Sequence, residues 1–265
     1  MPLLTVITVN YNDADGLRRT MESVLGQHGV ELEYIVIDGG STDGSVDVIQ
    51  AYADKGISYW VSEKDGGIYP AMNKGVRWAH GTYVNFMNAG DVYYSDDTLA
   101  QVMGQLDADI VAGSHVMDGV VKHPKSQLTM ADLFTDALNH QSSFIRLELL
   151  RQHPYREDFR IVSDWIFTVE MLVSHHASLR VIDSVIAVYD STGISNTRAA
   201  ERDAERQRFL QTFLPPLIYS DYQQWVAWRR CELYPHLASV GKLRYGCQRI
   251  IARLVMMLTK ILKWL

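Results

Sequence analysis

Val6-Ile7-Thr8-Val9-Asn10-Tyr11-Asn12 joins an apolar strand pattern directly to a polar cluster. The same arrangement recurs in Ile35-Val36-Ile37-Asp38-Gly39-Gly40-Ser41 and in Tyr83-Val84-Asn85-Phe86-Met87-Asn88-Ala89-Gly90-Asp91. Strands of this kind, buried side by side, bring their polar ends to one edge of a sheet. Because open α/β sheets bind their ligands at that edge, the three clusters predict a ligand site built from distant parts of the chain.

The composition is that of a globular protein. Of the 265 residues 47% are hydrophobic, and 18 Gly and 7 Pro are too few for a low-complexity or fibrous chain. The formal net charge of −6 argues against a nucleic-acid partner, since nucleic-acid-binding domains usually carry a basic surface. Cys231 and Cys247 lack the paired spacings of zinc or redox sites, which favours a reducing, cytoplasmic compartment.

The sequence predicts neither export nor a membrane span. Leu3 to Val9 has the pattern of a first strand rather than of a signal peptide, because no basic segment precedes an apolar stretch. No segment offers eighteen or more unbroken apolar residues, so we expect no spanning helix. Any membrane contact is therefore expected to be peripheral.

Strand and helix patterns alternate through the first part of the chain. Asp13 or Asp15 can cap the helix that follows the first strand. The elements expected next are a helix Gly16–Leu25, a strand Leu32–Ile37, a helix Ser45–Tyr52, a strand Ile57–Val61, a helix Tyr69–Ala79 and a strand Thr82–Met87. Four strands joined by short crossovers predict an α/β fold with a largely parallel sheet.

Beyond Asp91 the alternation becomes irregular, and a hairpin is expected at Asp118-Gly119. The other expected elements are a helix Thr98–Leu106, a strand Asp109–Ala112, helices Met130–Leu138, Leu147–Gln152 and Asp164–Val173, and a strand Leu179–Val188. A charged helix is expected to start near Thr197 and to end at Pro215-Pro216, and a helical tail follows it.

Two of the polar clusters contain an acid with two possible roles, and Asp38 is not needed for its turn. Asp38 fits either a capped strand-to-helix connection or a carboxylate that accepts a hydrogen bond from a nucleobase or a ribose hydroxyl. Asp91 fits either an ordinary turn or a ligand of Mg²⁺ or Mn²⁺, which prefer carboxylate and water oxygens. Asp96 and Asp97 better fit the cap of the next helix.

In their order and spacing these segments resemble the family 2 glycosyltransferases, which are inverting nucleotide-sugar enzymes with the GT-A fold. The resemblance covers residues 1–195 and rests on Thr5–Asn12, the Asp38 segment, Ser62–Tyr69, Ala71–Gly75, Asn88–Asp91, His140-Gln141 and Ser163–Trp165. It implies a Rossmann-like, mostly parallel mixed sheet flanked by helices, with a C-terminal helical extension.

The resemblance also implies where the donor binds. The Val9 backbone and the Tyr11 ring would lie beside the base, and Asp38 would bond its edge, which makes uridine diphosphate the default nucleotide. The implied nucleotide- and donor-binding residues are Val9, Asn10, Tyr11, Asp38, Asp65, Asn73, Lys74, Asn88, Ala89 and Gly90. Three of these have ordinary structural alternatives: Asp65 as part of a loop, Lys74 as a solvated helix residue, and Asn73 as a tie between loop and helix.

The family's metal motif is usually Asp-x-Asp, and in this chain Asn88 replaces its first acid, which leaves Asp91 as the single firm carboxylate. An amide oxygen can still ligate a hard cation, and the donor diphosphate brings oxygens of its own. The resemblance therefore implies weak, substrate-assisted binding of Mg²⁺ or Mn²⁺ at Asp91.

The resemblance places the catalytic base at Asp164, whose ordinary alternative is a helix N-cap or first-turn acid. His140 and Gln141 would face the acceptor or the donor sugar. Gly193, Ile194 and Ser195 resemble a segment that closes over the donor.

From Lys242 onward every charged residue is basic, and most of these residues fall on one side of a helix that is otherwise apolar. This pattern predicts an interfacial helix on an anionic membrane surface. A helix that packs on its own protein or on a partner subunit in a homo-oligomer is the alternative.

We therefore interpret the chain as an inverting glycosyltransferase that moves a sugar from a nucleoside diphosphate donor to a glycan or lipid-linked acceptor in bacterial cell-surface polysaccharide biosynthesis. It would act in the cytoplasm, at the inner face of the cell membrane. The expected domains are a GT-A domain over residues 1–195, with a nucleotide-sugar half to residue 100, a helical extension over 196–240 and a basic helix over 241–265. A nucleotidyltransferase and a catalytically silent nucleotide-sugar-binding protein are the alternatives.

Overall fold

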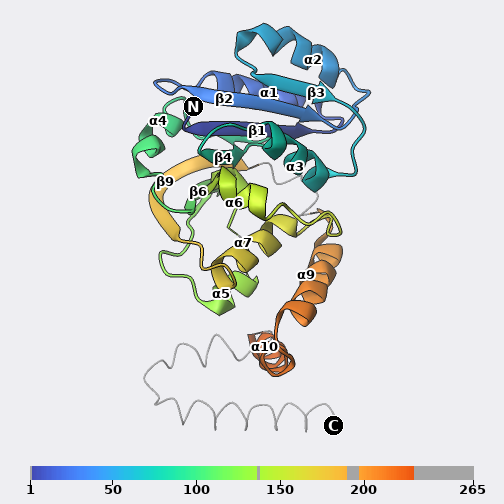
Figure 1. Ribbon diagram of the computed structural model, residues 1–265, viewed down its shortest axis with the longest axis vertical. Helices are drawn as coiled ribbons and strands as arrows, with labels where there is room; N and C mark the ends of the chain where they lie inside the picture. Colours follow the sequence, from blue (N-terminus) through green and yellow to red (C-terminus); the bar gives the residue numbers. More distant parts are fainter. Residues whose placement is uncertain (1, 136–137, 190–196, 230–265) are drawn as a thin grey trace. The chain divides into compact units, whose positions relative to one another are not determined.

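The computed structural model describes residues 2–135, 138–189 and 197–229 (Figure 1). The chain divides into two compact units, Met1–Gln207 and Arg208–Leu265. Residues 193–195, both cysteines and the basic helix expected over residues 242–265 lie outside the described residues. Within the described part of the chain, no helix is both long and apolar enough to span a bilayer.

Nine strands of the described residues form one sheet in the order β3-β2-β1-β4-β8-β6-β9-β5, and β7 pairs with β6 off this path. The strands are β1 Leu4–Asn10, β2 Leu32–Asp38, β3 Tyr59–Ser62, β4 Tyr83–Phe86, β5 Val92–Tyr93, β6 Ile110–Met117, β7 Val120–Lys122, β8 Ser143–Arg146 and β9 Leu179–Tyr189. This mixed, mostly parallel sheet confirms the expected fold class.

The first four strands of the sheet are parallel, as expected. β1 pairs with β2 on one side and with β4 on the other, so that Asn10 lies opposite Asp38 and Ile7 opposite Phe86. All seven residues of β1 are buried, because helices cover both faces of this part of the sheet. The carboxyl ends of the three strands therefore meet at one edge.

The other half of the sheet is mixed. β8 runs antiparallel to both β4 and β6, whereas β9 runs parallel to β6 with a register shift between Ala112 and His115. β6 returns as β7 through Asp118 and Gly119, whose φ angles are 51° and 74°. Positive φ at both positions is the geometry of a type I′ hairpin, which confirms the predicted turn.

Helices cover the two faces of the sheet in separate apolar clusters. α1, α2 and α4 pack on the face that carries Val6 and Val36, and α3, α6 and α7 pack on the face that carries Ile7 and Ile37. The helices are α1 Ala14–Leu25, α2 Ser45–Tyr52, α3 Ile68–Trp78, α4 Thr98–Val102, α5 Met130–Thr135, α6 Leu147–Gln152, α7 Ser163–Val173, α9 Ala199–Phe213 and α10 Pro216–Arg229, with 3₁₀ turns η1 Ala53–Lys55, η2 Met103–Gln105 and η3 His140–Ser142. Alternate strand residues thus enter opposite cores.

The helix starts differ in detail from those expected. Asp13, not Asp15, caps α1, because its Oδ1 accepts a hydrogen bond from Gly16 N at 2.9 Å. Asp97 occupies the N-cap of α4 but makes no side-chain cap, since its carboxylate faces His28 Nδ1 at 3.3 Å. The expected cap position is therefore confirmed for Asp97, whereas the expected side-chain cap is not formed.

The first unit ends later in the chain than residue 195, where we expected the catalytic domain to end. The start of α9 still contacts the first unit, because the Glu205 carboxylate accepts hydrogen bonds from Arg160 N and Ile161 N, both at 2.9 Å. These contacts tie that part of α9 to the segment that leads into α7.

Gly75 lies in α3 where this helix packs on β1 and β2. A Cβ at this position would come within 2.6 Å of Ile7 Cγ2, a methyl group fixed in a buried strand. We expect Gly75→Ala to lower the free energy of unfolding by about 1–3 kcal/mol, because overpacking outweighs the better helix propensity of alanine. Urea unfolding followed by circular dichroism measures this change.

Gly104→Ala is the matched control, because a Cβ at Gly104 meets no atom within 4 Å. We expect this variant to change the free energy of unfolding by less than about 1 kcal/mol. Equal urea-unfolding midpoints for Gly75→Ala and Gly104→Ala would contradict the close packing of α3 on β1.

Candidate functional site

A cavity of about 910 Å³ opens at the carboxyl edge of the parallel strands. This volume suits a drug-sized or nucleotide-sized ligand. Ten of the residues predicted from the sequence line it: Val9, Asn10, Tyr11, Asp65, Asn88, Ala89, Asp91, His140, Gln141 and Asp164. The predicted convergence of separate segments on one cavity is therefore observed for Asp91 and Asp164.

Asp38 lies behind the cavity wall and is fully buried. Its Oδ1 accepts hydrogen bonds from Asn10 Nδ2 at 2.7 Å and Ser41 Oγ at 2.6 Å, and its Oδ2 accepts one from Ser62 Oγ at 2.6 Å. Burial raises the pKa of Asp38, but these hydrogen bonds outweigh burial and hold the pKa below its ordinary value. The carboxylate thus organises the turn, while Asn10 and Gly39 line the cavity.

Tyr11, Gly39 and Asp65 lie close together at the β1 end of the cavity. Tyr11 is 69% exposed, so its ring is accessible to a ligand. A Cβ on Gly39 would lie 3.2 Å from Tyr11 Cδ2 and 3.1 Å from Asp65 Oδ2, so glycine allows both side chains to approach the backbone this closely. A flat ligand ring can stack on the exposed face of Tyr11.

Asn73 and Lys74 do not line the cavity. Asn73 donates to Tyr155 O at 2.8 Å and accepts from Tyr155 N at 3.0 Å, so its amide ties α3 to the loop before α7. Lys74 Nζ lies 2.9 Å from Glu63 Oε1, and its side chain is 14% exposed. Asn73 therefore has the structural role that was the alternative to donor binding. Neither Asn73 nor Lys74 lines the cavity with the other residues expected to bind the donor.

The turn after β4 places Asn88 and Asp91 side by side at the cavity. Asp91 is 3% exposed, and its Oδ2 accepts a hydrogen bond from Gln141 Nε2 at 2.7 Å. Gly90, between them, has a φ of 96° and does not line the cavity. Its role is to allow the turn, because residues with a Cβ rarely adopt this conformation.

The residues of this turn could supply only part of the ligand shell of a hard divalent cation. Within the described residues, Oδ1 of Asn88 and Oε1 of Gln141 are buried without a hydrogen-bond partner, and both lie on residues that contact or neighbour Asp91. No group of three or more His, Cys, Asp or Glu that could hold a metal exists in the described part of the chain. A cation here would need oxygens from substrate or water.

Asp164 stands in the first turn of α7 and does not cap the helix. Tyr69 Oη donates to Asp164 Oδ1 at 2.8 Å, and His140 Nδ1 lies 3.0 Å from Asp164 Oδ2. The side chain of Asp164 is 18% exposed and lines the cavity. The carboxylate is therefore held from two sides and remains open to a ligand.

The protonation states of this group follow from its contacts. Burial raises the pKa of Asp164, but the hydrogen bonds from His140 and Tyr69 outweigh it and hold the pKa below its ordinary value. Burial and the neighbouring Asp164 charge raise the pKa of Tyr69 well above its ordinary value. At neutral pH Asp164 is ionised and Tyr69 is protonated.

His140 links the acid to the turn after β4. Its Nδ1 must carry the proton, because an ionised carboxylate can only accept. Its Nε2 lies 2.9 Å from Asn88 Nδ2, which donates to it. His140 is thus bonded at both ring nitrogens, and its ring faces Asp164.

The sequence did not predict several residues of the cavity, among them Tyr69 and four basic side chains. Tyr69 belongs to the Ser62–Tyr69 segment, but nothing in the sequence indicated that its hydroxyl would reach Asp164. The basic side chains on the cavity wall are Lys64, Arg160, Arg202 and Arg206. Arg202 and Arg206 are four residues apart on α9, a spacing that places both on one helix face, and this was the available signal.

Comparison with known proteins identifies related sequences. The family profile described as "Glycosyl transferase family 2" matches residues 5–173. An uncharacterized glycosyltransferase of Mycobacterium tuberculosis is 32% identical over 212 residues, which cover 74% of this chain and 78% of that protein. A PGL/p-HBAD biosynthesis glycosyltransferase of Mycobacterium bovis is 30% identical over 205 residues, which cover 74% of this chain and 80% of that protein.

Solved structures share the fold. S. aureus TarS has a TM-score of 0.63 at 18% identity over 94% of this chain, which spans 47% of the TarS chain. A mannosyltransferase from Pyrobaculum calidifontis, solved with GDP-Man and Mn²⁺, has a TM-score of 0.63 at 20% identity over 97% of this chain and 80% of its own. At these identities the likeness establishes the GT-A fold.

Tyr69→Phe removes one hydrogen bond to Asp164 and leaves the ring packing in place. We expect the free energy of unfolding at neutral pH to fall by about 1.5–3 kcal/mol, because the lost bond goes to a charged acceptor. A carboxylate whose pKa is lowered by folding stabilises the protein above the pKa of the unfolded chain. That stability is lost as pH falls through the lower folded pKa. The difference between wild type and variant should therefore narrow in acid.

Urea unfolding between pH 3 and 8 measures this difference. Tyr94→Phe is the control: its side chain is 55% exposed, and no hydrogen bond of its hydroxyl is found among the described residues. A loss of stability in Tyr69→Phe that stays constant down to pH 3 would show that the hydroxyl does not act through the ionised carboxylate.

Proposed function

We propose a reaction for this chain from the premise that it belongs to glycosyl transferase family 2. It is a transferase that moves a sugar from a nucleoside diphosphate donor to a hydroxyl group, with inversion at the anomeric carbon. The acceptor is a glycan or a lipid-linked saccharide. The observation that carries the proposal is the ionised carboxylate of Asp164, which faces a nucleotide-sized cavity and is held by Tyr69 and His140.

The proposed donor is a UDP-sugar, bound with its base stacked on the Tyr11 ring beside Gly39 and Asp65. TarS has been solved with UDP and with UDP-GlcNAc, and the Pyrobaculum calidifontis mannosyltransferase with GDP-Man. These ligands favour a nucleoside diphosphate sugar as the donor class. In this proposal Asp38 acts indirectly, because it fixes Asn10 and the turn that carries Gly39.

The diphosphate lies between the arginine side chains of the cavity wall and the turn after β4. Arg160, Arg202 and Arg206 supply cationic donors that suit phosphate oxygens. Asp91, with the amide oxygen of Asn88, would hold Mg²⁺ or Mn²⁺ together with the diphosphate. When bound, such a cation neutralises charge that develops on the leaving group.

Asp164 serves as the general base. The acceptor hydroxyl attacks the anomeric carbon on the face opposite the diphosphate; a bond from acceptor oxygen to carbon forms, and the bond from carbon to phosphate oxygen breaks. The hydroxyl proton passes to the Asp164 carboxylate, and the electron pair leaves with the nucleoside diphosphate. His140 and Tyr69 hold the carboxylate in place for this transfer. No covalent enzyme intermediate is needed.

The names of some relatives support a biological setting. A Mycobacterium bovis relative is named for PGL/p-HBAD biosynthesis, and TuaG of Bacillus subtilis, 38% identical over 97 residues, is named for putative teichuronic acid biosynthesis. We place this chain in bacterial cell-surface polysaccharide or glycolipid assembly. The basic and apolar pattern of residues 242–265 supports contact with an anionic membrane surface.

Asp164→Asn tests the proposed base, because an amide cannot take the proton. We expect kcat for release of the nucleoside diphosphate in the presence of acceptor to fall by about 10²- to 10⁴-fold. Donor affinity, measured by calorimetry, should stay near that of wild type, since Asp164 acts on the acceptor. Asp96→Asn, at an exposed acid outside the cavity, is the control. Near-normal turnover in Asp164→Asn would remove this residue from the role.

Asp91→Ala tests the cation. In wild type we expect Mn²⁺ to raise the affinity for UDP. In Asp91→Ala we expect the factor by which Mn²⁺ raises this affinity to be smaller by about tenfold or more, because the carboxylate of the proposed cation site is lost. Calorimetry with and without Mn²⁺ measures both, independently of turnover. UDP binding and transfer that survive full chelation and the Asp91→Ala change would refute the metal role.

A further inference from the structure

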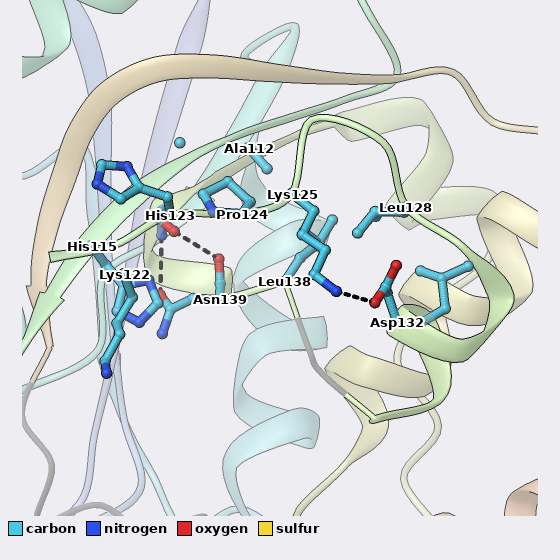
Figure 2. A pocket seen from close by; sticks show the side chains of 13 residues that line it. Ala112, His115, Lys122, His123, Pro124, Lys125, Leu128, Asp132, Leu138 and Asn139 are labelled. Carbon is cyan, nitrogen blue, oxygen red and sulfur yellow. Dashed lines mark hydrogen bonds and ion pairs between the residues drawn. The ribbon is translucent and has the colours of Figure 1, made fainter. Parts of the chain in front are cut away.

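A second, smaller cavity of about 250 Å³ lies beside the main one (Figure 2). Its wall comes from β6, β7, the segment after β7, α5 and η3. His115, Leu138 and Asn139 line both cavities, so the two spaces are neighbours. Nothing in the reaction described so far uses this second cavity.

The polar groups of the small cavity are mainly hydrogen-bond donors. His115, Lys122, His123 and Lys125 all line it. Among the described residues that line it, Asp132 is the single acid, and its carboxylate pairs with Lys125 Nζ and accepts from Thr129 N at 2.9 Å and Thr129 Oγ1 at 2.7 Å. The acid is thus neutralised locally, and the cavity keeps an excess of positive charge.

Two of these donors are placed for a ligand. Lys122 faces His115 across the β6–β7 pair, and its side chain makes no ion pair within the described residues. His115 Nδ1 is buried without a hydrogen-bond partner in the same part of the chain. His123 differs, because its Nδ1 already bonds Ser114 Oγ at 2.8 Å. A buried ring nitrogen without a partner is costly, and a ligand oxygen in the cavity that His115 lines would satisfy it once the ring turns toward that space.

The position of the cavity separates it from the donor nucleotide. In the sheet, β4 and β8 lie between β1 and β6, which at the usual strand spacing puts β6 roughly 14 Å from β1. On the near side, Asn139 precedes His140, the residue that holds Asp164. A group in the small cavity therefore lies near the proposed base and away from the strand that carries Tyr11.

We propose that this cavity is an acceptor subsite that binds a phosphate group, with Lys122 and His115 as its ligands. The inference rests on the proposed function and narrows its acceptor to a phosphorylated saccharide. A phosphate offers acceptor oxygens to every donor of the cavity, and its charge matches the excess of basic side chains. The apolar wall formed by Pro124, Leu128 and Leu133 lowers the local dielectric and strengthens these contacts.

The test uses the full-length chain saturated with UDP, and the probe is inorganic phosphate. Histidine ring signals in NMR, assigned with His115→Gln and His123→Gln, report binding. In wild type we expect the His115 signals to shift with added phosphate after UDP has filled the donor site. Lys122→Ala should weaken this phosphate binding by about tenfold or more, and Lys122→Arg should restore most of it. Lys55→Ala removes an equivalent exposed charge far from the cavity and should leave the phosphate affinity unchanged.

Three outcomes would overturn the subsite: no shift of the His115 signals with phosphate, equal phosphate affinity in wild type and Lys122→Ala, or UDP alone shifting the same signals and blocking phosphate. The last outcome would assign the cavity to the donor. Failure of the proposed function would give a different result. Wild type would then bind no nucleoside diphosphate and would cleave no nucleotide sugar, whether or not phosphate binds.

Discussion

The hydrogen-bonded register of β1 with β2 and β4 is the constraint on which the site depends. It sets Asn10 opposite Asp38 and brings the turn after β4 to the same edge. Because the strands are buried on both faces, their polar ends cannot slide without exposing apolar side chains or burying polar ones. Buried polar groups at that edge need partners, and Asp38 supplies them to Asn10, Ser41 and Ser62.

A second consequence concerns Asn88, which stands where the family usually has an acid. Its amide donates to His140 Nε2, so one imidazole ring bridges Asn88 and Asp164. A carboxylate at this position could only accept a hydrogen bond, and His140 would then need a proton on each ring nitrogen. In the proposed mechanism, the loss of an acid from the metal motif and the support of the proposed base are therefore two effects of one residue.

Much of the fold could be predicted from the sequence because burial and backbone conformation leave local patterns. Apolar runs predicted β1, β2 and β4, and Asp118-Gly119 predicted the hairpin between β6 and β7. Side-chain partners leave no such pattern. Tyr69 bonds Asp164 across 95 residues of sequence, and Asn73 bonds Tyr155 across 82. Only the packing of α3 against α7 and the preceding loop makes these pairs.

The sequence by itself determined the parallel sheet, the edge where its polar ends gather and the candidate acid Asp91, since these follow from periodicity and turn chemistry. The order of the motifs, through the family resemblance, added the candidate acid Asp164. The tertiary structure decided which polar residues face the cavity. It buried Asp38 behind the wall, turned Asn73 and Lys74 away, and brought Tyr69, His140 and the basic side chains of α9 around the cavity. The physical reason is that a hydrogen bond depends on distance and direction in space, which residues far apart in the chain acquire only when the layers pack.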